Sequence, residues 1–189
     1  METSPDSIEL RASITELQAS TFEFCSAEAI TLPDTLERLG EYSLAQCSSL
    51  ETLTLPYSLM MIDPGALMGC SAELYSDSVA FTILDNAVYS SDLTTLIWYG
   101  GDWEETEFTV PGGVQTIAGY AVNCANLETL YLPDSLFYIG EGGIGYSLTR
   151  EYGESSVRLN TSLTVIGPDS TGVTGYAAAN ELCYFTGEP

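Results

Sequence analysis

Apolar residues recur along this chain in one spacing that two long segments share. Residues 47–62 and residues 124–139 both follow the frame C-x-x-L-x-x-L-x-L-P-x-x-L-x-x-I. Within this frame Leu53 and Leu55 alternate with threonines, which is the period of a β-strand with one buried side. So short a strand cannot bury its apolar side alone. A frame that returns every 22 or 23 residues therefore predicts a solenoid, in which stacked coils share one core.

Aligning the copies on the residue after each strand, usually a proline, places six predicted strands. We expect them in one parallel β-sheet on the concave face, with short helical turns and loops outside. The helical turns are predicted where a small residue, an apolar residue and a cysteine recur, as at Ala66, Leu67 and Cys70. The predicted strands are Ile8–Leu10, Ile30–Leu32, Leu53–Leu55, Phe108–Val110, Leu130–Leu132 and Val157–Leu159.

The frame is interrupted once, between residues 72 and 107, and changes again at the end of the chain. The interruption contains three β-rich runs separated by turn residues at 85–86 and 91–92, which predicts a β-hairpin inserted in one enlarged coil at about 79–107. The tail predicts a short helical turn and a last strand, forming a C-terminal cap at about 168–189. We expect residues 1–189 to form a single domain.

Composition narrows the possible partners. The chain has 27 acidic residues, four arginines, no lysine and no histidine, for a net charge of −23. This charge disfavours binding to nucleic acid or to anionic membranes, both of which need basic patches. No apolar run reaches the length of a transmembrane helix, so direct membrane insertion is not expected. No signal peptide is visible, which fits either a cytosolic protein or a removed leader.

Few catalytic or metal-binding arrangements are compatible with this sequence. The absence of histidine excludes Ser-His-Asp and Cys-His catalysis, and no phosphate-binding glycine motif occurs. A pair of carboxylates, as in a carbohydrate-acting enzyme, stays a distant alternative. We predict no cofactor and no metal site. The calcium-loop pattern is missing, and we interpret the acidic stretch 102–105 as a solvated loop.

The cysteines follow the repeat. Four of them occupy the same slot in successive coils and none forms a C-x-x-C pair, which favours small buried side chains over zinc ligands. We therefore predict that these four are reduced and buried. A fifth, Cys183, lies in the predicted cap strand, and we expect it to be packed too. The four repeat cysteines are Cys25, Cys47, Cys70 and Cys124.

Together these signatures resemble the BspA-like leucine-rich repeats, also called the Treponema pallidum type. The resemblance rests on strands ending in Leu-Pro, on the Ile-Gly step at Ile139-Gly140, and on the recurring cysteine slot. Residues 85–99 resemble an insertion typical of that family. The resemblance implies a bacterial cell-surface or secreted protein that takes part in adhesion and protein binding, with no catalytic residues to carry over.

We therefore predict a non-enzymatic recognition or adhesion module. The first alternative is a structural spacer of a larger surface protein, without a ligand of its own. A row of small polar side chains on the strands would favour the spacer, exposed aromatics would favour recognition, and a deep pocket with paired carboxylates would favour an enzyme.

The outward strand positions form the predicted binding face. The partner is expected to be a protein or peptide, host-derived in the setting of the family, and basic because the flanks are acidic. Tyr131 is the one aromatic residue at these positions in the predicted strands, and aromatics commonly dominate binding energy. We predict contacts at Thr54, Thr109 and Tyr131. Trp98 and Trp103 form a second-choice patch, although packing of the hairpin is the simpler interpretation of these tryptophans.

Overall fold

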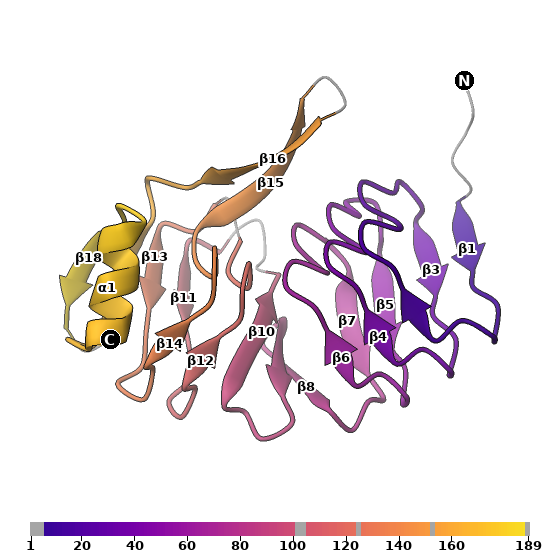
Figure 1. The fold of residues 1–189 in the computed structure, drawn as a ribbon, viewed down its shortest axis with the longest axis horizontal. Coiled ribbons are helices and arrows are strands. Elements are labelled where there is room, and N and C mark those ends of the chain that lie inside the picture. The colour runs from indigo at the N-terminus through magenta and orange to yellow at the C-terminus, as the bar shows by residue number, and fades with distance from the viewer. Residues whose placement is uncertain (1–5, 101–104, 124–125, 152–153, 188–189) are drawn as a thin grey trace.

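The protein is a β-solenoid whose coils stack along its long axis (Figure 1). The structure, a computed structural model, describes residues 6–100, 105–123, 126–151 and 154–187. Apart from one helix, its regular elements are short β-strands, and most pairs between neighbouring coils are parallel. The predicted solenoid of parallel strands is confirmed.

One side of the coils, which we call the front, contains two parallel sheets. Leu53 and Leu55 point into the core there, whereas Thr52 and Thr54 are exposed. The N-terminal front sheet contains β1 (Ser7–Glu9), β3 (Ala29–Thr31), β5 (Thr52–Leu55) and β7 (Glu73–Ser76). The C-terminal front sheet contains β11 (Glu107–Thr109), β13 (Thr129–Tyr131), β17 (Thr164–Gly167) and β18 (Cys183–Thr186).

A second side is built from two-residue strands that also stack in register. They come from the second half of the repeat frame, where Leu39 and Ile117 are fully buried. Glu16 and Arg38 are directly paired across one such ladder. The strands are β2 (Glu16–Leu17), β4 (Arg38–Leu39) and β6 (Met61–Ile62) in the first half, and β12 (Thr116–Ile117) and β14 (Tyr138–Ile139) in the second.

The third side consists of consecutive turns where short helical turns were predicted. In the first coil Ser20 and Phe24 adopt φ values of 57° and 58°, which a right-handed helix does not allow. Their amides then point to the next coil instead of to their own turn. The amide nitrogens of residues 20, 22 and 24 lie 2.9, 2.8 and 2.8 Å from the carbonyl oxygens of residues 41, 43 and 45. This side therefore holds neighbouring coils together by hydrogen bonds, as the two strand-lined sides do.

Glycine is required on this side at two equivalent places. The ring of Tyr42 lies over Gly65 of the next coil, and the ring of Tyr120 lies over Gly142 in the same way. An added Cβ would approach the rings to 2.5 and 2.3 Å, and both glycines have positive φ. A side chain at either glycine would therefore displace the tyrosine above it.

Side-chain hydroxyl groups form hydrogen bonds between successive coils where the chain turns after a repeat proline. The residue two positions after the repeat proline is a serine or threonine in three coils, and each donates a hydrogen bond to a carbonyl of the preceding coil. The donor–acceptor distances are 2.8 Å for Thr35 to Ile14, 2.6 Å for Ser58 to Leu36 and 2.7 Å for Ser135 to Val114. These bonds, of which those of Ser58 and Ser135 are partly buried, satisfy carbonyls at positions where the chain changes direction.

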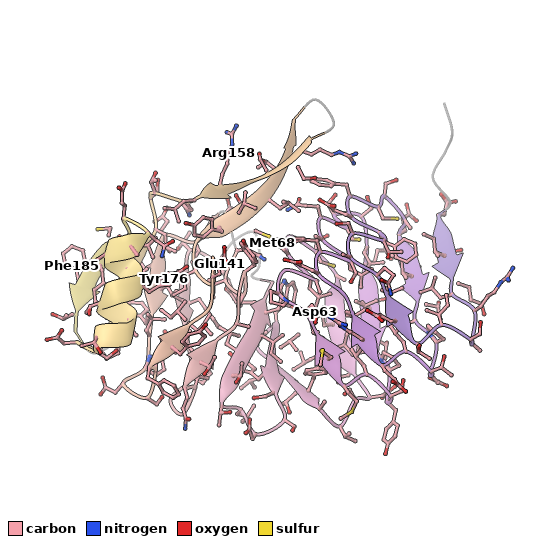
Figure 2. All side chains as sticks on the ribbon, in the orientation of Figure 1. Asp63, Met68, Glu141, Arg158, Tyr176 and Phe185 are labelled. Atoms are coloured by element: carbon pink, nitrogen blue, oxygen red, sulfur yellow. The ribbon has the colours of Figure 1, made fainter. Side chains whose placement is uncertain are left out.

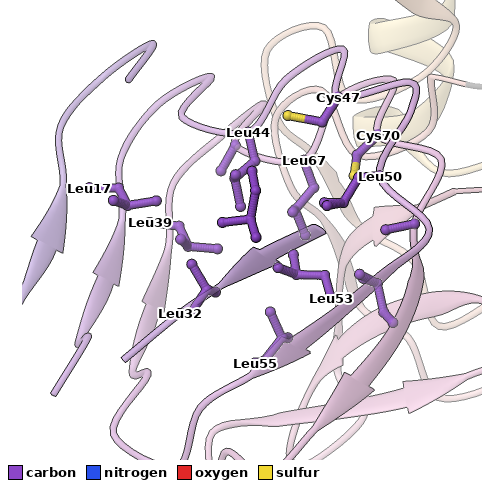
Figure 3. Close-up of a cluster of buried hydrophobic side chains, with 14 of the residues drawn as sticks. Leu17, Leu32, Leu39, Leu44, Cys47, Leu50, Leu53, Leu55, Leu67 and Cys70 are labelled. Carbon is purple, nitrogen blue, oxygen red and sulfur yellow. The ribbon is translucent and has the colours of Figure 1, made fainter. Parts of the chain in front are cut away.

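The predicted inserted hairpin forms a partition across the solenoid. It contains β8 (Phe81–Leu84) and β9 (Ala87–Ser90), and β9 pairs antiparallel with β10 (Thr95–Tyr99). Val88 and Trp98 belong to the N-terminal core, which Figure 3 shows in part, whereas Tyr89 and Leu96 belong to the C-terminal core. A register shift between residues 96 and 98 lets β10 direct side chains to both cores.

Two strand predictions are wrong. The expected single parallel sheet is two front sheets, because β7 and β11 are not paired with each other. Val157–Leu159 is not a solenoid strand, because it lies in β16 (Glu154–Leu159), which pairs antiparallel with β15 (Tyr146–Glu151). The solenoid strand at this place is β17, with Val165 beside Leu130. Val157 is 38% exposed and Val165 is 1% exposed, so burial distinguishes the two similar patterns.

The β15–β16 hairpin leaves the C-terminal half and reaches over the N-terminal coils (Figures 1 and 2). Leu148 is 6% exposed and packs in one cluster with Ala45 and Met68. The guanidinium carbon of Arg150 lies 5.2 Å from the centre of the Phe24 ring. Further along, the hydroxyl of Ser155 donates a 2.8 Å hydrogen bond to the carboxylate of Glu23. The hairpin therefore connects the two halves from outside the coils.

A helix and a strand complete the described chain in the region predicted to be a cap. The helix α1 (Thr171–Ala179) buries Val173 and Ala177 and contacts β14, while β18 extends the C-terminal front sheet. Tyr176 points from α1 towards the coils (Figure 2), and its hydroxyl accepts a 3.0 Å hydrogen bond from the amide of Ile144.

The burial pattern of the front sheets predicts a contrast in stability. Leu53 and Leu130 are 1% and 0% exposed, so replacing either with alanine should lower the free energy of unfolding by about 2–5 kcal/mol. Thr54→Ala, a change at an exposed position, should cost less than about 0.5 kcal/mol. Urea titration of the three variants measures the difference. Equal losses would mean that the two faces of the strands are inverted.

Candidate binding surface

The outward side chains of the N-terminal front sheet are mostly short. Strand register places them in two rows, one per outward position. Tyr75, which is 50% exposed, is the one large member and lies beside Thr54. The first row is Ser7, Ala29, Thr52 and Glu73, and the second is Glu9, Thr31, Thr54 and Tyr75.

The C-terminal front sheet has a different outward surface. Its strand pairing brings Tyr131, Ile166 and Phe185 onto three neighbouring strands, and we call these three residues the apolar row. Tyr131 and Ile166 are half-buried and Phe185 is 57% exposed, with neighbouring strands about 4.8 Å apart. Thr109 extends this line by one strand. Figure 2 shows Phe185 on the outermost strand of the described chain.

The predicted contact residues divide between the two sheets. Thr109 and Tyr131 are direct neighbours, whereas Thr54 lies in the N-terminal front sheet. Tyr75 was not among the predicted contacts because β7 lies where the repeat spacing shortens, although the alternation of Ala72 and Leu74 along the chain was a usable sequence signal. Ile166 and Phe185 were not among the predicted contacts because the repeat frame predicts the solenoid strand at Val157–Leu159, whereas the structure places it at β17, beside β18.

The prediction that Trp98 belongs to an exposed second-choice binding patch is wrong. Trp98 is 2% exposed and packs in the N-terminal core, so its ring cannot meet a ligand while the core is intact. The simpler interpretation of Trp98, packing of the hairpin, is confirmed. Trp103 lies outside the described residues.

Charge is distributed unevenly over these surfaces. In the N-terminal half the amides of Glu28, Glu51 and Glu73 each bond to the carbonyl of the acidic residue one coil earlier, beginning with Asp6. This stacking holds Asp6, Glu28 and Glu51 exposed in a column beside the front sheet, and Glu73 continues the column as the first residue of β7. Arg38 on the second side is already engaged, because its guanidinium lies 2.6 Å from Asp63 and 3.3 Å from Glu16. These carboxylates raise the pKa of Arg38, Asp63 more than Glu16.

The cysteines divide according to burial. Cys47 and Cys70 are buried, as predicted, whereas the prediction of a buried Cys25 is wrong because this side chain is half-buried. Cys183 is exposed on β18, so the expectation that it is packed is wrong, because its position in the strand points away from the core. Cys124 lies outside the described residues. Burial raises the pKa of the Cys47 thiol to about 12 and that of Cys70 to about 11.

Thiol reactivity follows from these positions. Because the thiolate is the reactive species, Cys183 should react first with a thiol reagent, whereas Cys47 and Cys70 should react only on unfolding. Mass spectrometry of the native protein after brief labelling measures the order. Since folding raises both buried pKa values, the contribution of these thiols to stability should decline as the pH rises above 9.0. Rapid native labelling of Cys47 would contradict the packing.

Short parallel strands in register, stacked leucines and connecting turns define the class of this protein as a leucine-rich repeat solenoid. The sequence matches the family described as BspA type leucine rich repeat region in six copies, over residues 2–96 and 103–170. The chain belongs to this family. Leucine-rich repeats are commonly protein-binding modules, and proteins of this class are typically non-enzymatic.

Several solved structures share the fold. A leucine-rich cell surface protein of Faecalibacterium prausnitzii has 24% identity and a TM-score of 0.67 over 88% of this chain and 42% of its own. The pneumococcal vaccine antigen PcpA has 19% identity and a TM-score of 0.53, covering 96% of this chain and 58% of its own. A leucine-rich repeat protein of Eubacterium ventriosum has 15% identity and a TM-score of 0.53, with coverages of 88% and 55%.

This chain thus spans about half the length of the solved proteins it resembles, and it matches no curated protein. Two of these proteins are described as a cell surface protein and a vaccine antigen. Among the residues that the structure describes, no helix is long and apolar enough to cross a membrane. In the same part of the chain, no group of three or more acidic or cysteine side chains is arranged to hold a metal ion.

Proposed function

We propose that this protein is a non-enzymatic recognition module of a bacterial surface or secreted protein, and that it binds another protein through the C-terminal front sheet. The observation that supports this most directly is the apolar row, with Phe185 57% exposed at one end. Aromatic side chains combine large contact area with low conformational entropy and often dominate interface energy. A shallow, strand-lined surface of this kind fits a folded partner better than a small molecule.

Tyr131 is the centre of the proposed contact. It lies between Thr109 and Ile166 on neighbouring strands, so a partner that covers the apolar row also covers Tyr131. Its ring is half-buried, and a side chain that is partly enclosed before binding loses less conformational entropy on binding. The net charge of −23 favours a basic partner and should accelerate association at low ionic strength.

A spacer role fits the N-terminal front sheet better. Its rows consist mainly of serine, alanine, threonine and glutamate, which offer little apolar contact area, and Tyr75 is the exception. We therefore propose that the N-terminal coils mainly position the C-terminal surface, with Thr54 outside the principal contact. A surface location is supported by the descriptions of two similar structures as a cell surface protein and a vaccine antigen.

Alanine substitution tests the proposed surface once a partner has been selected from a panel of extracellular proteins. Tyr131→Ala should weaken binding by roughly tenfold or more, the loss expected for a central aromatic contact. Tyr57 is the matched control, because it is an exposed tyrosine at a turn away from the apolar row. Tyr57→Ala should leave the dissociation constant within about twofold. Calorimetric titration of both variants measures the difference.

The same titrations can contradict the proposal. Tyr131→Ala should retain the unfolding midpoint closely enough to exclude loss of the fold. If folded Tyr131→Ala and Phe185→Ala proteins both bind as tightly as the parent, the C-terminal front sheet is not the binding surface. If Thr54→Ala alone abolishes binding, the N-terminal front sheet is the binding surface.

A further inference from the structure

A cleft opens where the front of the solenoid is interrupted between its two halves. Its volume is about 930 Å³, towards the upper end of the range of roughly 300–1,000 Å³ common for ligand sites. Its lining includes the beginning of β7, the turn between β8 and β9, and residues 147–149 of the β15–β16 hairpin. The apolar row does not line this cleft.

The cleft contains the unpaired edge of a β-sheet. The amides of Glu73 and Asp77 donate to carbonyls of the preceding coil, at 2.9 Å each. Because backbone groups alternate along a strand, the amide and carbonyl of Leu74 point to the opposite side of β7. Leu74 lines the cleft, and within the described chain no strand pairs with this side of β7. A donor and an acceptor of the main chain are therefore available there.

The charge of the cleft has one sign. Glu73, Asp85 and Glu105 contribute carboxylates, and the described lining contains no arginine. All three residues are exposed, so their charges act on whatever enters from solvent. Side-chain amides of Gln46 and Asn123 also line the cleft, and amides can both donate to and accept from a peptide backbone.

We propose that this cleft binds an extended basic peptide segment of a partner protein, which pairs with the free edge of β7. An extended chain presents backbone groups along one edge, and pairing with a sheet edge is a common mode of peptide recognition. Lysine or arginine side chains of the peptide would neutralise the carboxylates of Glu73 and Asp85, two exposed acids of the lining, whereas Glu105 already accepts a 2.8 Å hydrogen bond from the hydroxyl of Tyr99. This site is independent of the apolar row, so each can be tested without the other.

The probe is an acetylated and amidated hexapeptide of alternating lysine and valine, titrated by calorimetry at low ionic strength. A peptide with glutamate for lysine tests the charge requirement. Two further peptides are N-methylated at alternate residues, one along each edge of the extended chain, and each lacks the amide donors of that edge. We expect the basic peptide to bind, the acidic one not to bind, and at least one N-methylated form to bind about fivefold to tenfold more weakly.

Variants locate the binding. Glu73→Gln combined with Asp85→Asn should weaken binding of the basic peptide by about fivefold. Asparagine is suitable at position 85 because it tolerates the positive φ of this residue. The matched control is Glu9→Gln combined with Asp34→Asn, two exposed acids in the first coils outside the cleft, which should change affinity by less than about twofold. Tyr131→Ala should leave this affinity unchanged.

Hydrogen exchange of the Leu74 amide provides a direct readout, because strand pairing should slow its exchange when the basic peptide is bound. The proposal is wrong if the basic peptide does not bind, if the acidic peptide binds equally well, or if both N-methylated forms bind as tightly as the parent. Equal losses in the cleft variant and in the Glu9/Asp34 control would indicate general attraction to an acidic protein and would also contradict it.

Discussion

Registered stacking of the coils is the constraint on which the whole structure depends. A strand of three or four residues gains little by itself, and its leucines are buried because the coils before and after it present leucines at the same height. Hydrogen bonds repeat this register on all three sides of the coil. A coil of a different length would move the residues of the following coils out of alignment with those of the preceding coils. The enlarged coil therefore has to end in register with the second side, which β10 does by pairing with β12.

The partition of β8, β9 and β10 keeps the second side of the two halves in register, but it divides the front into two separate sheets. β9 is buried on both faces, and together with β10 it gives each half of the protein its own core. Trp98 fills the N-terminal side and Tyr89 fills the C-terminal side. The β15–β16 hairpin then connects the halves from outside, through Leu148 and Arg150. Interruption of the repeat thus creates a second kind of surface, a cleft with a free strand edge, which a uniform solenoid lacks.

The two front sheets share a backbone arrangement and differ in what they offer to a partner. Short hydroxyl-bearing side chains dominate the N-terminal sheet, so its outward surface is polar and nearly flat. Apolar side chains line up on the C-terminal sheet because β17 and β18 add Ile166 and Phe185 beside Tyr131. Since the chain has 27 acidic residues and four arginines, attraction to basic partners is a property of the whole molecule, and local contacts have to provide the specificity.

Periodicity in the sequence determined the fold class, the buried leucines such as Leu53, the buried repeat cysteines Cys47 and Cys70, and the outward position of Thr109. These follow from local spacing, which each coil repeats. The sequence could not separate Val157–Leu159 from the true strand at Val165, because both alternate apolar and polar residues and only packing against Leu130 distinguishes them. Tertiary structure alone decided that Thr54 and Tyr131 belong to different sheets, that Trp98 is buried, and that β7 has a free edge in a cleft. Each of these depends on which distant segments meet after one irregular coil, and contacts between such segments leave no period in the sequence.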